Sequence, residues 1–263
     1  MKNLRVAILQ HALCWEQIDA NLAQFEEQIW QIEKEIDLLV LPEMFTTGFT
    51  MTPTNVAEPV NGRTMTWMKQ MAKQLSAVVM GSYVVNVKGT FRNRMYAVWP
   101  NGENLFYDKK HLFSLAGEDQ GYEAGRDRVI FDIDGWRVMP QICYDLRFPV
   151  WTRSKSAVEE LYEYDLLVYS ANWPSPRVHA WNTLLQARAI ENQCYVIGVN
   201  RTGSDELNND YPGKSGVYDY LGEGIEVLDH QPGNIVAELD GAGMHSFRKR
   251  YPFQVDADGF DLS

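Results

Sequence analysis

Apolar runs and amphipathic segments alternate along the first third of the chain. Residues 5–10 and 38–41 are largely apolar, which predicts two buried strands. Between them, apolar residues recur every three or four positions and predict an amphipathic helix: Leu22, Phe25, Ile29, Ile32 and Ile36. A helix over 63–76, with its methionines in the core, is expected to lead to a strand over 77–85. This order of elements favours an α/β fold.

The alternation of helix and strand returns in the second half of the chain. A helix is expected from Pro149 to about Tyr164, followed by a strand, a helix and a strand over 165–169, 178–193 and 195–199. The remainder should contain a loop over 201–214, two or three strands up to Leu239 and a short basic turn, His245–Arg250. Predicted helices and strands therefore alternate in a similar order in the two halves of the chain.

Two segments between these halves have the pattern of antiparallel hairpins. An Asn-Gly pair, which supplies the positive φ angles of a tight turn, joins strands over 91–98 and 104–107. The second hairpin has its strands over 129–133 and 136–142, and Pro140 implies an edge or a bulge. We therefore expect mixed sheets covered by helices, a layered α/β sandwich, in a single domain of 263 residues.

Composition narrows the range of partners. The chain has 24 Lys and Arg against 35 Asp and Glu, a net charge of -11, which repels nucleic acids and anionic lipid surfaces. No apolar run is long enough to span a membrane, and the N-terminus lacks the hydrophobic region of a signal peptide. Three cysteines cannot all pair. A reduced cytoplasmic enzyme or binding protein fits these features best.

Several common site motifs fail on inspection. Gly213-Lys-Ser215 lacks the first glycine of a phosphate-binding loop, because Asn208 stands there. Val227 stands where a dinucleotide fingerprint starting at Gly222 requires its third glycine. The five histidines show no spacing typical of metal ligands, and no Gly-x-Ser-x-Gly motif is present.

Cys143 is the candidate nucleophile. It ends a predicted strand, and a helix start close behind it would favour the thiolate. Cys14 and Cys194 adjoin apolar strands and fit inert, buried thiols. No histidine occupies a comparable strand end, so Glu43, which follows the apolar strand 38–41, is the better candidate for a base. On position alone, a solvated loop carboxylate explains Glu43 equally well.

Two long irregular segments are expected to form pocket walls. The loop 44–62 is rich in Thr, Phe and Met, and 108–125 places charged residues beside an apolar patch. Lys109 and Lys110 begin the second segment, and either could place a positive charge near a developing oxyanion. Most such lysines are surface charges.

Three segments carry a resemblance to a known family: Leu-Pro-Glu43, Lys109-Lys-His-Leu-Phe113 and Ile-Cys143-Tyr-Asp-Leu-Arg-Phe-Pro149. In this order they resemble the signature segments of the nitrilase superfamily of carbon–nitrogen hydrolases. The likeness extends to 184–192 and 213–215 and is strongest to the omega-amidase branch. The family's lysine lies two residues before a histidine, which selects Lys109. Its second glutamate precedes a glycine by seven residues and matches Glu118.

The resemblance implies a nitrilase-like, four-layer α-β-β-α sandwich with mixed sheets, commonly paired into a homodimer. It implies that Glu43 moves protons, that Cys143 forms a thioester, and that Lys109 and the Tyr144 backbone N–H hold the oxyanion. Glu118 would orient Lys109. No metal or organic cofactor is implied.

The omega-amidase resemblance also implies a substrate class, the small dicarboxylate monoamides such as 2-oxoglutaramate and 2-oxosuccinamate. The residues expected to line the pocket are Phe45, Phe113, Tyr144, Arg147 and Trp173. A structural ion pair is the alternative role for Arg147.

Other activities stay open at this point. The same residues would serve an aliphatic amidase, an N-carbamoyl hydrolase or a nitrilase. A catalytically silent binding subunit would be expected to lack Glu43, Lys109 or Cys143, and all three are present.

Overall fold

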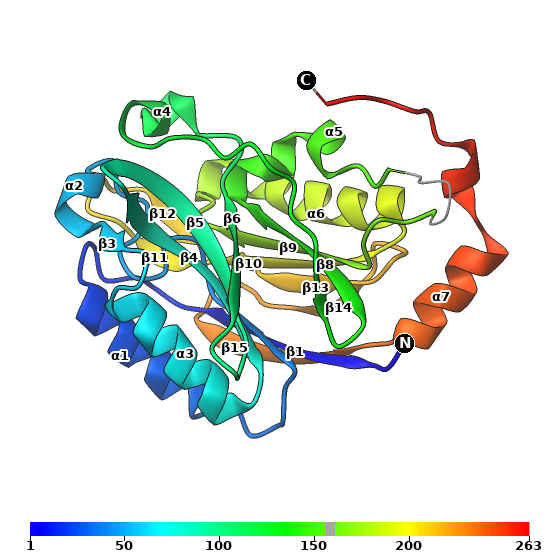
Figure 1. Cartoon of the computed structure of the whole chain (residues 1–263), viewed down its shortest axis with the longest axis horizontal. Coiled ribbons are helices and arrows are strands. Elements are labelled where there is room, and N and C mark those ends of the chain that lie inside the picture. Colours follow the sequence, from blue (N-terminus) through cyan, green and yellow to red (C-terminus); the bar gives the residue numbers. More distant parts are fainter. Residues whose placement is uncertain (156–160, 263) are drawn as a thin grey trace.

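Most strands belong to two mixed sheets (Figure 1). The structure is a computed structural model that describes residues 1–155 and 161–262. The strands of the first sheet are, in spatial order, β15 (Gly233–Leu239), β1 (Leu4–Gln10), β2 (Leu38–Val40), β4 (Val78–Val87), β5 (Thr90–Val98) and β6 (Asn104–Asp108), with β3 (Glu58–Pro59) paired to β4. Those of the second are β14 (Gly224–Val227), β13 (Gly216–Tyr218), β10 (Tyr195–Asn200), β9 (Leu166–Ala171), β8 (Trp136–Ile142) and β7 (Phe131–Ile133). A separate hairpin pairs β11 (Thr202–Ser204) with β12 (Asp210–Pro212).

Both sheets combine parallel and antiparallel pairs. β1, β2 and β4 are parallel, as are β8, β9 and β10, and these strands form the middle of each sheet. The predicted hairpins are confirmed as β5 with β6 and β7 with β8. The pairing of β8 with β7 extends only to Val138, so Pro140 pairs with β9 on one side only, which accommodates its missing N–H.

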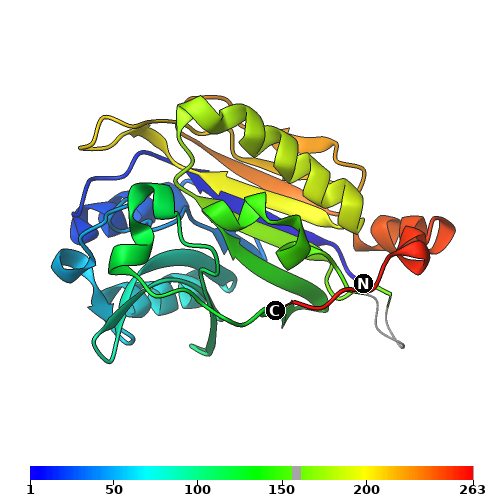
Figure 2. The same cartoon turned by 90° about the horizontal axis from the view of Figure 1, so that it is seen from above.

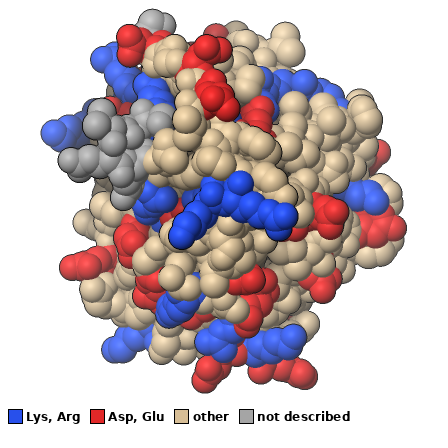
Figure 3. Space-filling view, turned by 90° about the vertical axis from the view of Figure 1, so that its right-hand side faces the viewer, with Lys and Arg blue, Asp and Glu red and all other residues tan. Residues whose placement is uncertain are grey.

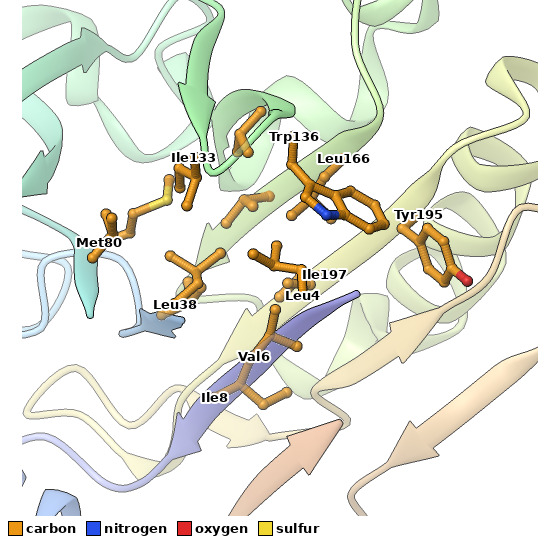
Figure 4. Packing of buried hydrophobic residues seen from close by; sticks show 14 of the residues in the cluster. Leu4, Val6, Ile8, Leu38, Met80, Ile133, Trp136, Leu166, Tyr195 and Ile197 are labelled. Carbon is orange, nitrogen blue, oxygen red and sulfur yellow. The ribbon is translucent and has the colours of Figure 1, made fainter. Parts of the chain in front are cut away.

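Alternating side chains along each strand divide the core into layers. In β1, Leu4, Val6 and Ile8 point between the two sheets, whereas Ala7 and Leu9 point toward the helices. Figure 4 shows the central layer, where Leu38 and Met80 of the first sheet face side chains of the second. Each fully buried aliphatic side chain contributes about 1.5–3 kcal/mol relative to an exposed one.

Helices cover the outer face of each sheet (Figures 1 and 2). α1 (Ile18–Ile29) and α3 (Arg63–Leu75) cover the first sheet, with Met65, Met68 and Met71 buried in the core as predicted. α6 (Val178–Asn192) covers the second sheet. The expected α-β-β-α sandwich is therefore confirmed. The shorter elements are α2 (Pro53–Val56), α4 (Glu118–Gly121), α5 (Pro149–Thr152), α7 (Gly241–Arg250) and 3₁₀ turns at Ser114–Ala116, Cys143–Arg147, Ser175–Arg177 and Phe253–Asp256.

The predicted first helix is too long. α1 ends at Ile29, although Ile36 is buried in the same cluster and Ile32 packs against it. The chain has to turn back here, because β2 runs parallel to β1 from Leu38. Loop residues that pack on the core can continue a helical spacing by chance, which misplaced the boundary.

Two predictions in the second half are also wrong. The helix expected from Pro149 to about Tyr164 ends at Thr152, and the part of that prediction on 156–160 lies outside the described residues. The loop over 201–214 contains the β11–β12 hairpin.

The expected basic turn at 245–250 is part of helix α7. The weak helix formers Gly241 and Gly243 concealed its start, but the Asp240 carboxylate accepts a hydrogen bond from the Gly243 backbone N–H at 2.9 Å and caps the helix. Three basic residues form the last turn, where they complement the helix dipole. Figure 3 views the side of the molecule that carries α7 and shows Lys and Arg side chains gathered across its middle, among scattered Asp and Glu. None of the helices described is long and apolar enough to cross a membrane.

Candidate active site

A pocket of about 290 Å³ opens beside the ends of strands of the second sheet. Its aromatic lining residues are Phe49, Phe113, Tyr144, Trp173 and Tyr211. The two segments predicted as walls, 44–62 and 108–125, contribute Phe49 and Phe113. Cys143 and Asn172 lie in the same lining, directly after the ends of β8 and β9. The pocket thus lies at the carboxyl ends of these two strands, where open α/β sheets place their sites.

Glu43, Lys109 and Glu118 form a fully buried cluster, which we call the charge cluster. Glu43 follows β2, Lys109 follows β6, and Glu118 begins the short helix α4. The Lys109 ammonium donates to Glu43 Oε1 at 2.9 Å and to Glu118 Oε1 and Oε2 at 3.0 and 2.8 Å. Its three donors are thereby satisfied. The three residues that the sequence placed far apart are brought together.

The electrostatics of the charge cluster favour a permanently charged lysine. Burial lowers the pKa of Lys109, but the carboxylates of Glu118 and Glu43 outweigh burial and raise it well above that of a free lysine. Burial, together with the charge of Glu43, raises the pKa of Glu118 against the opposing effect of Lys109. Removing Lys109 would leave two buried carboxylates without their cation, whereas removing either glutamate would leave the ammonium with a single carboxylate.

Two asparagines hold Glu43 in a single orientation. Asn93 Nδ2 donates to Glu43 Oε1 at 2.8 Å, and the backbone N–H of Asn172 donates to Oε2, also at 2.8 Å. Asn172 Nδ2 donates to the Glu43 backbone carbonyl at 2.6 Å. Neither asparagine was predicted from the sequence to be functional. Asn172 could have been predicted as a site residue, because it is a polar residue directly after an apolar strand. Asn93 lies inside β5, and no sequence pattern distinguishes it.

The backbone of Cys143 adopts a left-handed conformation, with φ of +43°. This conformation is costly for a residue with a Cβ atom, and it ends β8 abruptly at the pocket. The half-buried thiol lies 3.9 Å from the Asn172 carbonyl oxygen. A helix does start close behind Cys143, as predicted, but α5 is a single turn from Pro149, and the thiolate is not favoured, because the pKa of the thiol is raised.

Burial, followed by the charge of Glu43, raises the pKa of the Cys143 thiol well above its usual value, although Lys109 opposes the shift. The resting side chain is therefore a thiol, and nucleophilic attack requires a base. Of the other cysteines, Cys194 is buried as expected, whereas Cys14 is half-buried. All three cysteines are free.

The structure places all but one of the predicted pocket residues in the pocket lining. Phe113, Tyr144, Arg147 and Trp173 all line the pocket. Phe45 does not, because its side chain packs between α1 and α3 and the first sheet, with its ring 5.7 Å from that of Phe25 and 5.8 Å from that of Trp67.

Two guanidinium groups face the pocket. Arg147 lies 5.0 Å above the Trp173 ring, and Arg177 lies 5.1 Å above the Phe113 ring. Within 1–155 and 161–262 neither group has a carboxylate partner, so the ion pair considered for Arg147 is not formed. Arg177 precedes α6 on an irregular turn, where no sequence pattern distinguishes it from a surface arginine.

Comparisons with known proteins agree with this geometry. The carbon–nitrogen hydrolase family model matches residues 5–249. The chain is 44% identical to the omega-amidase YafV of Escherichia coli over 263 residues, which is all of both chains. It is 34% identical to the 2-oxoglutaramate amidase of Bacillus subtilis over 238 residues, 89% of this chain and 90% of the relative.

A solved structure of a related protein has the same fold. It is that of a CN-hydrolase superfamily protein from Xanthomonas campestris with an arsenic adduct in the active site. It superposes with a TM-score of 0.97 at 37% identity, covering 100% of both chains. The resemblance inferred from the three signature segments is confirmed, and the protein belongs to the carbon–nitrogen hydrolase family, as a hydrolase of carbon–nitrogen bonds other than peptide bonds.

Proposed function

We propose that this protein is an omega-amidase that hydrolyses the terminal amide of small dicarboxylate monoamides, such as 2-oxoglutaramate and 2-oxosuccinamate. The observation that carries the proposal is one pocket with a thiol beside a buried carboxylate–ammonium cluster and with two guanidinium groups that have no carboxylate partner among the described residues. The full-length likeness to omega-amidases supports it.

In the first step Glu43 takes the proton of the Cys143 thiol, and the sulfur attacks the amide carbonyl carbon. A carbon–sulfur bond forms, and the carbonyl π electrons move to oxygen. The raised pKa of Cys143 makes this transfer necessary, because few molecules hold a thiolate at neutral pH. Asn93 and Asn172 keep the Glu43 carboxylate aligned for it.

Once Glu43 carries the proton it holds the Lys109 ammonium less strongly, so the donor that pointed at Glu43, together with the Tyr144 backbone N–H, would stabilise the oxyanion. Fixed donors in a dry site cost little reorganisation during the reaction, which makes them effective. As the intermediate collapses, Glu43 returns the proton to nitrogen, the carbon–nitrogen bond breaks, and ammonia leaves. A thioester on Cys143 remains.

Water completes the cycle. Glu43 takes a proton from a water molecule, whose oxygen attacks the thioester carbonyl. The carbon–sulfur bond then breaks, and the sulfur regains a proton from Glu43. Glu118 would act through Lys109 by holding its ammonium with both carboxylate oxygens.

The free carboxylate of the substrate would bind between Arg147 and Arg177. Both guanidinium groups lie on aromatic rings that restrict their motion. Neither would have to break an ion pair with a described residue in order to bind the substrate carboxylate. The rings of Trp173 and Phe113, which lie beneath these guanidinium groups, would form the pocket walls along the carbon chain of the substrate.

The proposal extends to assembly and location. We expect a homodimer, and apolar side chains left exposed near the end of the chain, Tyr251, Phe253 and Val255, support an interface there. We also expect a cytoplasmic location, since three free thiols suit a reducing compartment. Light scattering tests the first expectation and cell fractionation the second.

Ammonia release from a substrate panel tests the activity. The panel contains 2-oxoglutaramate, 2-oxosuccinamate, glutamine, a neutral aliphatic amide, an N-carbamoyl compound and a nitrile. The two oxo-acid amides should give the highest kcat/KM, and Cys143→Ala should abolish release whereas Cys14→Ala should not. A preference for the neutral amide, the N-carbamoyl compound or the nitrile would contradict the assigned substrate class.

A further inference from the structure

The carboxylate of Asp145, two residues after Cys143, is fully buried and accepts hydrogen bonds from two separate segments. Its Oδ1 accepts from the backbone N–H and the Nδ1 of His111, at 2.9 and 2.8 Å. Its Oδ2 accepts from the Tyr107 hydroxyl at 2.8 Å and the Ile142 backbone N–H at 3.0 Å. A carboxylate offers about four acceptor sites, so this side chain is fully used.

The donors flank the two groups that must meet during catalysis. Tyr107 lies two residues before Lys109, and His111 lies two residues after it. Ile142 directly precedes Cys143, so its bond to Asp145 closes the turn over the nucleophile. One carboxylate therefore connects the lysine segment with the cysteine segment.

The hydrogen bonds of Asp145 help to hold the backbone of Cys143 in its strained, left-handed conformation. A left-handed backbone costs of order 1–3 kcal/mol and persists only where its surroundings fix it. The bond from the Ile142 N–H to Asp145 fixes the backbone one residue before Cys143. On the other side lies the Tyr144 N–H, which Asp145 follows directly.

Further contacts fix the side chains of Tyr107 and His111, which donate to Asp145. Burial, followed by the charge of Asp145, raises the pKa of Tyr107 well above its usual value, so its hydroxyl keeps its proton and donates. The Tyr107 oxygen also accepts from the Trp151 indole N–H and the Lys110 backbone N–H, both at 3.2 Å. The His111 ring stacks on Phe148, with centroids 3.8 Å apart.

We propose that Asp145 is a positioning residue, assisted by His111, that fixes the position of the Cys143 thiol relative to the Lys109 ammonium. The proposal rests on the function proposed above. It adds a role for a carboxylate that takes no proton and does not touch the substrate. Displacing a reacting group by about 1 Å can cost roughly a hundredfold in rate.

Asp145→Asn tests this role, because an amide NH₂ cannot accept the hydrogen bonds on its side. We expect kcat per folded molecule to fall about 10–100-fold, with KM for 2-oxoglutaramate changed less than about twofold. Asp165→Asn is the matched control, a buried carboxylate bound to Arg137 and Arg248 away from the pocket. It should lose stability but keep kcat. Equal kcat in Asp145→Asn and the wild type would overturn the proposal.

A pair of His111 variants decides the matter even if Asp145→Asn does not fold. His111→Asn keeps a donor near the Nδ1 position but loses the stacked ring, whereas His111→Phe keeps the ring and loses the donor. We expect kcat of the Asn variant to stay within about threefold of the wild type and that of the Phe variant to fall about tenfold or more. The reverse order would show that His111 acts only by packing and would overturn its positioning role.

Cys143→Ala separates this proposal from the proposed function. If that variant still releases ammonia, the proposed function fails, and the positioning role fails with it. If Cys143→Ala is inactive while the Asp145 and His111 variants match the wild type, the positioning role alone fails.

Discussion

The ammonium of Lys109 donates to both carboxylate oxygens of Glu118, at 3.0 and 2.8 Å, and so points at Glu43 with its remaining donor. Glu118 thus fixes the direction of the charge that the proposed mechanism places beside the oxyanion. The same Glu118 Oε2 accepts from the Phe113 backbone N–H at 2.6 Å, which ties the charge cluster to the pocket wall.

Lys109→Ala should lower kcat by about a hundredfold or more, because it removes an oxyanion donor. It should also lower the free energy of unfolding by about 3–5 kcal/mol, since two buried carboxylates lose their cation. Steady-state kinetics and urea unfolding measure the two effects. Lys110→Ala is the control, as its ammonium lies over the Trp151 ring outside the cluster. Near-wild-type activity of Lys109→Ala would remove Lys109 from the mechanism.

Glu118→Gln should lower kcat about tenfold or more with little change in KM, because Lys109 loses the charge that orients it. Stopped assays on 2-oxoglutaramate measure this effect. Glu123→Gln removes an exposed carboxylate of the same segment, paired with Arg92, and should leave kcat unchanged. Equal losses in the two variants would mean that Glu118 has no special role.

Arg147→Ala and Arg177→Ala should each raise KM for 2-oxoglutaramate about tenfold or more, since a hydrogen bond between charged groups contributes about 1.5–3 kcal/mol. Neither variant should affect a neutral amide of similar length. Kinetics on both substrates measure the difference, with the exposed Arg126→Ala as control. A similar loss on both substrates would argue for a general effect on the pocket instead of carboxylate binding.

Asp165 should make stability depend on pH in the acid range. Burial raises its pKa, but hydrogen bonds and charges from Arg137 and Arg248 outweigh burial and hold the pKa below that of a free aspartate. A depressed folded-state pKa stabilises the fold above the unfolded pKa of about 3.9, and this contribution is lost as pH falls through the folded pKa. The difference in unfolding free energy between wild type and Asp165→Asn should therefore shrink from about pH 6 to about pH 3. A constant difference would contradict this reasoning.

The fold was largely predictable because its signals are local. Largely apolar runs identify β1, β2 and β9 as buried strands, and Asn-Gly and Asp-Gly turns identify the hairpins. Errors arose where tertiary packing decides the structure. Ile36 continued a helical spacing from a loop, and α7 depends on a cap at Asp240.

The site was predictable where a residue directly follows a strand or stands in a family segment. Glu43 and Cys143 met both conditions, and Lys109 was separated from Lys110 only by the resemblance. Asn93 and Arg177 met neither condition, because their roles depend on which segments lie across from them. Phe45 showed the opposite error, since aromatic character alone does not reveal whether a ring faces a pocket or the core.

The thioester is the central claim, and intact-mass spectrometry of enzyme quenched during turnover of 2-oxoglutaramate tests it most directly. We predict an added mass equal to the acyl group, located on the peptide that contains Cys143 and absent from Cys143→Ala. An unmodified Cys143 in the wild type, with ammonia still released by Cys143→Ala, would contradict it.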